Sequence, residues 1–152
     1  MGGYLTEQFA ALWEGYADRR IKTGERAGQW KIAKDEIAFW RAYQELLRKI
    51  KIVDPACGSG AFLVAAFDDL HDESTRVNTA LEQLTGSRDL FDLDKEILNQ
   101  NLYGVDINAE SIEITKLSLW LKTAKYGKVL NSLDHNLRVG DSLIRFQWQE
   151  TF

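Results

Sequence analysis

The chain has 152 residues, of which 45% are hydrophobic and 28% charged, and its formal net charge is −4. This length suits one domain with a real core, and the composition is typical of a globular protein. No apolar run approaches the roughly 18 residues that span a bilayer, and no signal peptide is recognisable, so we expect no membrane partner. A single cysteine excludes an internal disulfide and favours a cytoplasmic location. Acidic and basic residues are mixed along the chain, so it lacks the basic stripe that is typical of a domain that binds DNA without help from other domains.

Two amphipathic helices are predicted in residues 1–49, which form a helical lead-in domain. The first covers Tyr4 to Ile21 and the second covers Trp30 to Lys49, because apolar residues recur at three- and four-residue spacing. The predicted stripes are Leu5, Phe9, Leu12, Trp13 and Tyr16 in the first helix, and Trp30, Ala33, Ile37, Trp40, Gln44 and Leu47 in the second. We expect both stripes to be core packing, since large rings dominate burial; a lid over a cofactor is the alternative.

Strands and helices alternate in residues 50–152, the second predicted domain. The pattern predicts strands at Lys51–Asp54, Leu102–Val105 and Leu137–Val139, with a Gly-rich loop and a helix after the first. A strong helix is predicted over Ala109 to Lys125, with Ile112, Leu117, Leu119 and Trp120 supplying apolar contacts. Residues 71–101 are polar and expected to be helical in pieces, with a break at Gly86-Ser87. This alternation predicts an α/β fold with a partial doubly wound, Rossmann-like parallel sheet.

Three acidic residues stand at the carboxyl ends of the three predicted strands: Asp54 before Gly58-Ser59-Gly60, Asp106, and Asp141. Ligands of doubly wound sheets bind at such strand ends. Each feature alone is explained by helix capping or turn chemistry, but three in this order favour a nucleoside site. Glycine lets the backbone approach a ligand closely, and carboxylates accept hydrogen bonds from ribose hydroxyls or from an exocyclic amine.

The loop chemistry disfavours a pyrophosphate ligand. A dinucleotide fingerprint requires a third small residue where this chain has Leu63, and no Gly-Lys-Ser/Thr sequence occurs for a P-loop. The nucleoside is therefore expected to lack a bound pyrophosphate.

Three segments resemble motifs of adenine-N6 DNA methyltransferases of restriction-modification systems. These are Asp54-Pro55-Ala56-Cys57-Gly58-Ser59-Gly60-Ala61-Phe62-Leu63, Tyr103-Gly104-Val105-Asp106-Ile107-Asn108, and Val139-Gly140-Asp141-Ser142-Leu143. The heptapeptide that begins at Asp54 is far more specific than any Gly-x-Gly. The resemblance covers about 50–144 and is closest to large fused restriction-modification enzymes and to type I modification subunits.

The resemblance implies an S-adenosylmethionine site. Asp54, Ala56, Cys57, Gly58 and Gly60 would line the methionine portion of this cofactor. Asp106 would bind the ribose hydroxyls and Ile107 would pack on the adenine ring. Asp141 would accept from the adenine amine, and Ser142 or Leu143 would offer a backbone N–H to the ring. Phe62 and Leu63 are assigned to the core.

The catalytic motif of the resembled family, Asn or Asp followed by Pro-Pro and an aromatic residue, is absent. It holds a flipped-out adenine, and a chain whose single proline is Pro55 cannot contain it. We therefore expect a truncated methyltransferase domain that binds DNA weakly or not at all by itself, and that exposes the apolar strand Lys51–Asp54 as an edge for self-association. An RNA or protein-glutamine methyltransferase, or a non-catalytic module with this fold, stays open as an alternative.

The cysteine, the histidines and a group of acidic residues are predicted to have no catalytic or metal-binding role. Cys57 is expected to be a small residue packed beneath the loop rather than a nucleophile. His71 and His135 lack neighbours at ligand spacing, so no metal site is predicted. The acidic residues Asp68, Asp69, Asp72 and Glu73 are predicted to form a solvated cluster at a helix end. The role of residues 71–101 stays open.

Overall fold

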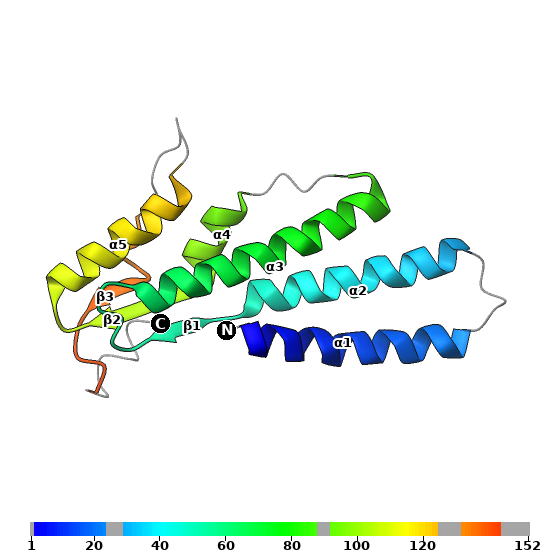
Figure 1. The fold of residues 1–152 in the computed structure, drawn as a ribbon, viewed down its shortest axis with the longest axis horizontal. Coiled ribbons are helices and arrows are strands. Elements are labelled where there is room, and N and C mark those ends of the chain that lie inside the picture. Colours follow the sequence, from blue (N-terminus) through cyan, green and yellow to red (C-terminus); the bar gives the residue numbers. More distant parts are fainter. Residues whose placement is uncertain (1, 24–28, 88–91, 125–131, 144–152) are drawn as a thin grey trace. The chain divides into compact units, whose positions relative to one another are not determined.

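The computed structural model describes residues 2–23, 29–87, 92–124 and 132–143 (Figure 1). In chain order its elements are α1 (Gly2–Thr23), α2 (Gln29–Lys49), β1 (Ile52–Asp54), α3 (Ala61–Thr85), α4 (Leu93–Gln100), β2 (Leu102–Asp106), α5 (Ala109–Thr123) and β3 (Leu137–Val139). The chain divides into two compact units: a helical unit of residues 1–48 and 72–91, and a sheet unit of residues 49–71 and 92–152. Among the described residues, no helix is long and apolar enough to cross a membrane.

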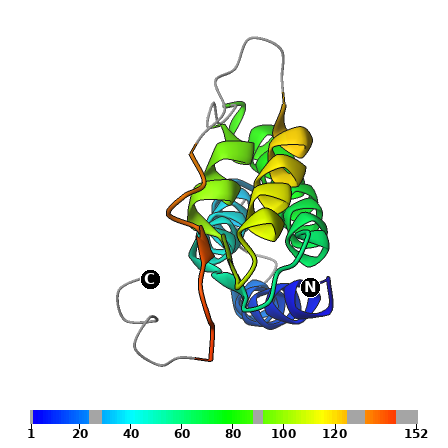
Figure 2. The ribbon, with the colours of Figure 1, turned by 90° about the vertical axis from the view of Figure 1, so that its left-hand side faces the viewer.

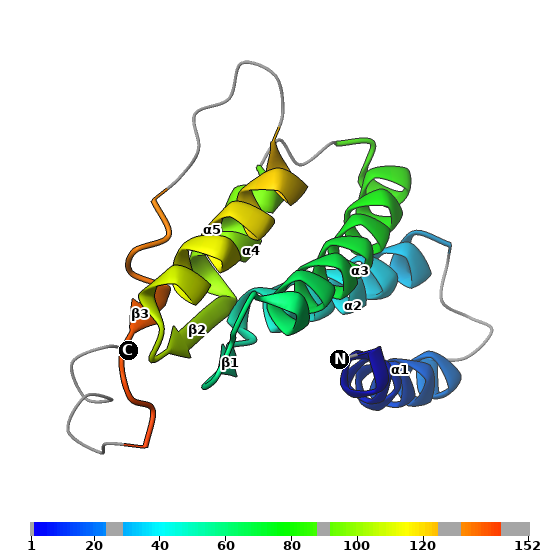
Figure 3. The ribbon, with the colours of Figure 1, turned by 60° about the vertical axis from the view of Figure 1, so that its left-hand side comes forward.

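In the described residues of the sheet unit, three parallel strands lie in the order β1-β2-β3 (Figure 3). Ile52 is in register with Leu102, and Gly104 is in register with Leu137. Helix α5 packs against β2 and β3, and α4 lies beside α5 (Figure 2). The predicted α/β class with a partial, Rossmann-like parallel sheet is confirmed. Because the strands are parallel, their carboxyl ends lie at one edge of the sheet.

The core of the sheet unit comes from the apolar faces of its helices and from all three strands. Its most buried side chains include Leu63, Phe67, Leu70, Ile97, Leu102, Ile112, Leu119 and Leu137. Two predicted core residues are exposed instead: Phe62 by 51% and Leu117 by 54%. Both lie off the buried faces, which are spaced as Leu63-Phe67-Leu70 in α3 and Ile112-Leu119 in α5. Lys125, the predicted end of this last helix, lies outside the described residues.

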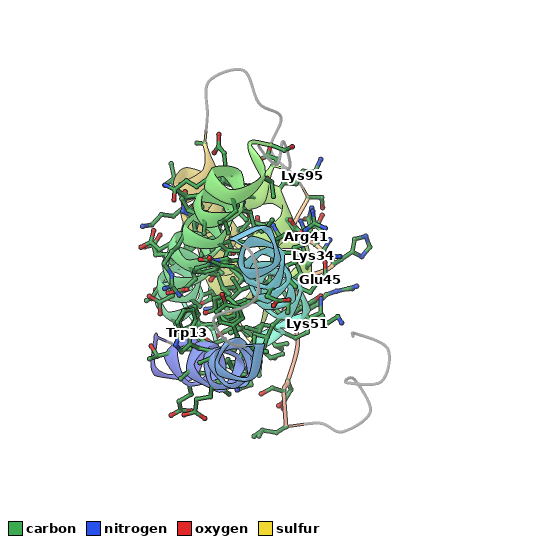
Figure 4. All side chains as sticks on the ribbon, turned by 90° about the vertical axis from the view of Figure 1, so that its right-hand side faces the viewer. Trp13, Lys34, Arg41, Glu45, Lys51 and Lys95 are labelled. Atoms are coloured by element: carbon green, nitrogen blue, oxygen red, sulfur yellow. The ribbon has the colours of Figure 1, made fainter. Side chains whose placement is uncertain are left out.

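The helical unit buries an aromatic face of α2 that differs from the predicted stripe. Phe39, Tyr43 and Leu47 are buried at four-residue spacing, whereas Ile37, Trp40 and Gln44 are only half-buried. The prediction is confirmed for Leu47, but the other buried residues, Phe39 and Tyr43, lie beside the predicted stripe. Trp30 and Ala33 lie outside the described side chains. Lys34, Arg41 and Glu45 point outward from the opposite side of α2 (Figure 4), so this face mixes both charges.

Helix α1 contributes Leu5 and Tyr16 to the same core, at 2% and 1% exposed, but Trp13 of the predicted stripe is 40% exposed (Figure 4). The Phe9 ring meets the Phe39 ring edge-on at 5.4 Å between centroids. Aromatic side chains therefore form much of this core, as expected. Among the described side chains, no contact identifies these aromatic residues as a lid over a cofactor.

Helix α3 forms the first part of the polar segment 71–101 and α4 lies near the end of this segment, so the prediction that it is helical in pieces is confirmed. Helix α3 ends at Thr85, so the predicted break at Gly86-Ser87 is confirmed. The predicted position of the acidic cluster at a helix end is wrong, because these residues lie in the middle of α3. Asp68 pairs with Lys122 at 2.6 Å, and Glu73 pairs with Arg76 at 2.7 Å.

Tyr43 gives the helical unit a pH-dependent term in its stability. Its fully buried hydroxyl lies 3.2 Å from Glu73 Oε2 and 3.4 Å from the Leu5 carbonyl oxygen. Burial and, second, the Glu73 charge raise the pKa of Tyr43 from 10.0 to about 12. The unfolded chain therefore loses this proton at lower pH than the folded chain, and stability falls as pH rises from 10 towards 12.

Replacing Tyr43 with phenylalanine is expected to remove this decline. Between pH 9 and pH 12, urea unfolding should show the wild type losing about 2–3 kcal/mol more stability than Tyr43→Phe, because one pKa unit corresponds to about 1.4 kcal/mol. Tyr4→Phe, at an exposed tyrosine, is the control and should follow the wild type. Parallel stability curves for the wild type and Tyr43→Phe would contradict the assignment.

Candidate functional site

The loop between β1 and α3 is fixed to the strand ends by backbone hydrogen bonds. The Cys57 amide donates to the Val105 carbonyl at 3.0 Å, which joins the loop to β2. The Ala56 amide donates to Asp54 Oδ1 at 3.2 Å, and the Gly60 amide donates to the Cys57 carbonyl at 2.8 Å. Gly58 and Gly60 have φ of +51° and +81°, a region that glycine enters without steric cost. The Gly-x-Gly pattern therefore reflects backbone conformation at both positions.

Two glycines also provide space beneath this loop. A Cβ on Gly60 would lie 2.7 Å from Thr115 Cγ2 of α5. A Cβ on Gly104, in the middle of β2, would lie 2.9 Å from Leu63 Cδ1 and 3.1 Å from Cys57 Sγ. By contrast, a Cβ on Gly58 would meet nothing within 4 Å. Gly60 therefore faces the protein interior, while the space beside Gly58 is open.

Asp106, the last residue of β2, connects all three strand ends. Its Oδ2 accepts from the Gly58 amide at 2.9 Å, and its Oδ1 accepts from the Asn108 amide at 2.8 Å. Its backbone carbonyl accepts from the Gly140 amide, beyond β3, at 2.9 Å. An ionised carboxylate offers about four lone-pair positions, so two remain for a ligand. Asp106 is thus both the anchor of the loops and a possible ligand acceptor.

The residues beyond β2 and β3 complete the strand-end region. Ile107 is 75% exposed and Leu143 is 92% exposed. The Leu143 amide donates to Asp141 Oδ1 at 2.9 Å, while Asp141 and Ser142 are half-buried. An exposed Ile107 beside Asp106 is an apolar surface on which a flat ring can pack.

The structure brings the sequence-derived candidates together in part. Asp106 accepts from the Gly58 amide, and Asp54 accepts from the Ala56 amide in the same loop. Asp141 follows Gly140, whose amide donates to the Asp106 carbonyl. Cys57 and Gly60 belong to the same loop but are buried beneath it. Their contribution in this structure is to shape the loop.

Sequence reasoning missed Thr115 and the packing role of Gly104. Thr115 is 0% exposed and donates its hydroxyl to the Gly58 carbonyl at 2.8 Å. One signal was present: Thr115 is the polar residue on the helix face of Ile112 and Leu119. A polar side chain on such a face needs a hydrogen-bond partner, and here the partner is the loop.

Cys57 is a buried thiol whose reactivity can be predicted. It is 6% exposed; burial is the main factor that raises the pKa of the Cys57 thiol, and a hydrogen bond with the Thr115 side chain lowers it in part. A high pKa leaves little thiolate, the reactive form, at neutral pH. Its burial confirms the predicted packing beneath the loop.

We therefore expect Cys57 to react slowly with a disulfide reagent such as dithionitrobenzoate. At pH 7.5 the native chain should be labelled at least about tenfold more slowly than the chain in urea. The chain has one cysteine, so the unfolded chain is its own control. Equal rates in the two states would show that the thiol is accessible and would contradict this placement.

The histidines do not form a metal centre in the described part of the chain. His71 Nε2 lies 3.3 Å from Asp94 Oδ1, and its ring stacks on Phe67 at 5.8 Å. His135 is exposed. Among the described residues, no group of three potential metal ligands occurs.

Comparison with known proteins identifies the family. The model of the MmeI DNA-methyltransferase domain matches residues 30–143, which include β1, β2, β3 and all of the candidate site residues. No solved structure matches the chain significantly.

Three curated relatives are named as methyltransferases. A putative type II restriction enzyme and methyltransferase of Methanocaldococcus jannaschii is 38% identical over 75% of this chain and 10% of its own length. DNA methyltransferase A of Bacillus subtilis is 31% identical over 67% of the chain and 13% of its own length. A type II restriction enzyme and methyltransferase of Escherichia coli is 32% identical over 62% of the chain and 11% of its own length.

The chain thus spans about a tenth of the length of these relatives. The resemblance to restriction-modification methyltransferases is confirmed, and the family implies a methyl-donor cofactor. From its strand-end motifs and from its match over residues 30–143, the chain belongs to the MmeI DNA-methyltransferase domain family.

Proposed function

We propose that this chain binds S-adenosylmethionine as the cofactor-binding portion of an adenine-N6 DNA methyltransferase of a restriction-modification system. The observation that carries the proposal is the position of Asp106. It anchors the Gly58 loop and the Gly140 turn and retains acceptor capacity. In parallel α/β sheets, a carboxylate at this strand end accepts from ribose hydroxyls.

The arrangement of the described residues fits this cofactor. Asp106 would hold the ribose, Ile107 would cover one face of the adenine, and Asp141 would accept from the adenine amine. Because the Leu143 N–H donates to Asp141 Oδ1, Leu143 would orient this carboxylate, and the backbone N–H that donates to the ring would come from Ser142. The methionine portion would lie along Asp54 to Gly60, where the space beside Gly58 is open. No phosphate has to be accommodated, which agrees with a loop that lacks the third small residue of a dinucleotide fingerprint.

The cofactor, when bound, supplies a methyl group on a positively charged sulfonium. The residues of this chain bind and orient that group, and orientation is a large part of catalysis when no covalent intermediate is needed. The family's Asn/Asp-Pro-Pro-aromatic tetrapeptide, which holds the target adenine, does not occur in these 152 residues. We therefore assign cofactor binding to this chain and adenine binding to residues outside it.

Two kinds of alternative exist: an enzyme with a different methyl acceptor, and a protein of this fold that catalyses no reaction. RNA or protein glutamine as the acceptor is less favoured. One of the three relatives above is named as a DNA methyltransferase, and the other two are named as combined type II restriction enzymes and methyltransferases. A non-catalytic interaction module would keep this fold without cofactor affinity. Binding measurements separate this module from the enzyme lineage.

Titration calorimetry with S-adenosylhomocysteine tests the proposal directly. We expect saturable 1:1 binding, with no comparable heat from NAD, whose pyrophosphate the loop does not suit. Incubation with radiolabelled S-adenosylmethionine and plasmid DNA should give no methyl transfer by this chain alone. Absence of S-adenosylhomocysteine binding would contradict the cofactor assignment, and robust methylation would contradict the division of roles.

DNA is proposed as the partner of the whole protein, not of this chain by itself. Within the described residues, β1 pairs only with β2 and Val53 is 39% exposed. Self-association through this edge stays a prediction, as does a cytoplasmic location.

A further inference from the structure

Thr115 lies beneath the Gly58–Gly60 loop although it belongs to α5, far along the chain. Its side chain is 0% exposed, in the middle of a helix whose neighbouring buried residues are Ile112 and Leu119. A hydroxyl buried in such surroundings is costly unless it is hydrogen-bonded. Thr115 Oγ1 donates to the Gly58 carbonyl oxygen at 2.8 Å.

Thr115 contacts the loop at two more points. Its Cγ2 occupies the position beside Gly60, 2.7 Å from where a Cβ would lie. Its side chain also lies close enough to the Cys57 thiol to lower the pKa of that thiol in part. One side chain thus acts on three residues of the loop, Cys57, Gly58 and Gly60, so the loop conformation and the Thr115 side chain depend on each other.

The hydrogen bond to Gly58 determines which way the next amide points. The described chain has no cis peptide bonds, and in a planar trans peptide the C=O and the following N–H point in opposite directions. Because the Gly58 carbonyl points inward to Thr115, the Ser59 N–H points away from α5. The neighbouring amides are engaged within the protein, that of Gly58 by Asp106 and that of Gly60 by the Cys57 carbonyl.

We propose that Thr115 is a positioning residue that aims the Ser59 N–H at the amino-acid portion of the cofactor. This inference rests on the proposed function, since it assumes that the methionine portion lies along this loop. Thr115 does not touch the ligand. It acts through the Gly58–Ser59 peptide, whereas Asp106 acts on the nucleoside portion.

Two ligands and two substitutions separate positioning from general stability. Thr115→Val keeps the shape of the side chain but removes the hydroxyl, and Thr115→Ser keeps the hydroxyl. S-adenosylhomocysteine carries the amino-acid portion, whereas 5′-methylthioadenosine lacks it. By calorimetry, Thr115→Val should weaken binding of S-adenosylhomocysteine roughly tenfold, the typical effect of one hydrogen bond to a charged group. Its affinity for 5′-methylthioadenosine should stay within about threefold of the wild type, and Thr115→Ser should restore binding of S-adenosylhomocysteine.

Each other outcome is informative. If Thr115→Val weakens the binding of both ligands equally, Thr115 only stabilises the fold. If this variant binds S-adenosylhomocysteine like the wild type, Thr115 has no effect on ligand binding. Either result overturns this inference but leaves the proposed function intact. If the wild type binds neither ligand, the proposed function fails, and this inference fails with it.

A measurement on the wild type covers the case in which Thr115→Val does not fold. By amide NMR, S-adenosylhomocysteine should shift the Ser59 resonance and slow its hydrogen exchange. 5′-Methylthioadenosine should leave the Ser59 amide nearly unchanged while shifting the resonances of Asp106 and Ile107. A Ser59 amide that responds equally to both ligands, or to neither, overturns the inference.

Discussion

Asp106→Ala is expected to weaken S-adenosylhomocysteine binding by about 100-fold or more. A hydrogen bond to a charged group contributes roughly 1.5–3 kcal/mol, and each 1.4 kcal/mol corresponds to about tenfold in affinity. The loss of two ribose hydroxyl contacts alone therefore reaches this size. The substitution also removes the acceptors of the Gly58 and Asn108 amides, which lie 2.9 and 2.8 Å from the carboxylate oxygens. Calorimetry measures the affinity, and thermal unfolding measures the accompanying loss of stability.

Asp106→Asn is the sharper variant because it keeps the size of the side chain. The two carboxylate oxygens each accept from a different backbone amide. An asparagine has one oxygen and one NH₂ group, so one of these amides would face another donor. We expect Asp106→Asn to lose most of the affinity, nearly as much as alanine, even though its volume is unchanged.

Asp134→Ala provides the matched control for charge. Asp134 is also in the sheet unit and also forms hydrogen bonds, to Lys116 at 2.7 Å and Ser132 at 2.7 Å, but it is exposed and outside the strand-end cluster. Its removal changes the net charge by the same amount as Asp106→Ala. If both variants bind S-adenosylhomocysteine like the wild type, Asp106 is not a ligand residue and the proposed site is misplaced.

The strand ends and their order were predictable because they depend on local signals. The strands are short, largely apolar runs; β1 and β2 end in an acidic residue, and Asp141 lies two residues after the end of β3. The turns after β1 and β3 carry Gly58, Gly60 and Gly140. In parallel α/β structure, such runs with intervening helices have few alternative arrangements. The meeting of the Asp54 loop with Asp106 therefore followed from topology, without knowledge of any contact.

The orientation of helices and the support of the loop were not predictable in the same way. Phe62 and Leu117 have the composition of core residues but lie off the buried faces of α3 and α5, and only tertiary packing decides between adjacent apolar positions. On α2, the apolar pattern allowed two faces, and the packing of Phe39 and Tyr43 selected one of them. Thr115 is a polar residue on a buried helix face, which indicates that it needs a hydrogen-bond partner, but no local pattern shows that this partner lies in the Gly58 loop.

Gly60→Ala is expected to destabilise the chain by about 2–5 kcal/mol. A side chain in the left-handed region costs roughly 1–2 kcal/mol, and Gly60 has a φ of +81°. Overpacking adds roughly 1–3 kcal/mol, because the new Cβ would lie 2.7 Å from Thr115 Cγ2 and 2.9 Å from Thr115 Oγ1. Urea unfolding of both proteins measures the difference in free energy. The variant should also bind S-adenosylhomocysteine more weakly, since the loop must move away from α5.

Gly58→Ala separates the cost of the left-handed backbone conformation from the cost of overpacking against Thr115. Gly58 also has a positive φ, of +51°, but a Cβ there meets nothing within 4 Å. This variant should show only the backbone cost of roughly 1–2 kcal/mol. Combining Gly60→Ala with Thr115→Ala completes a double-mutant cycle, in which removal of Cγ2 and Oγ1 should offset roughly 1–3 kcal/mol of the Gly60→Ala cost. Some strain should remain, because Thr115 Cβ would still lie 3.1 Å from the new atom. Strictly additive effects of the two substitutions would show that the contact between α5 and the loop does not limit residue 60 to glycine.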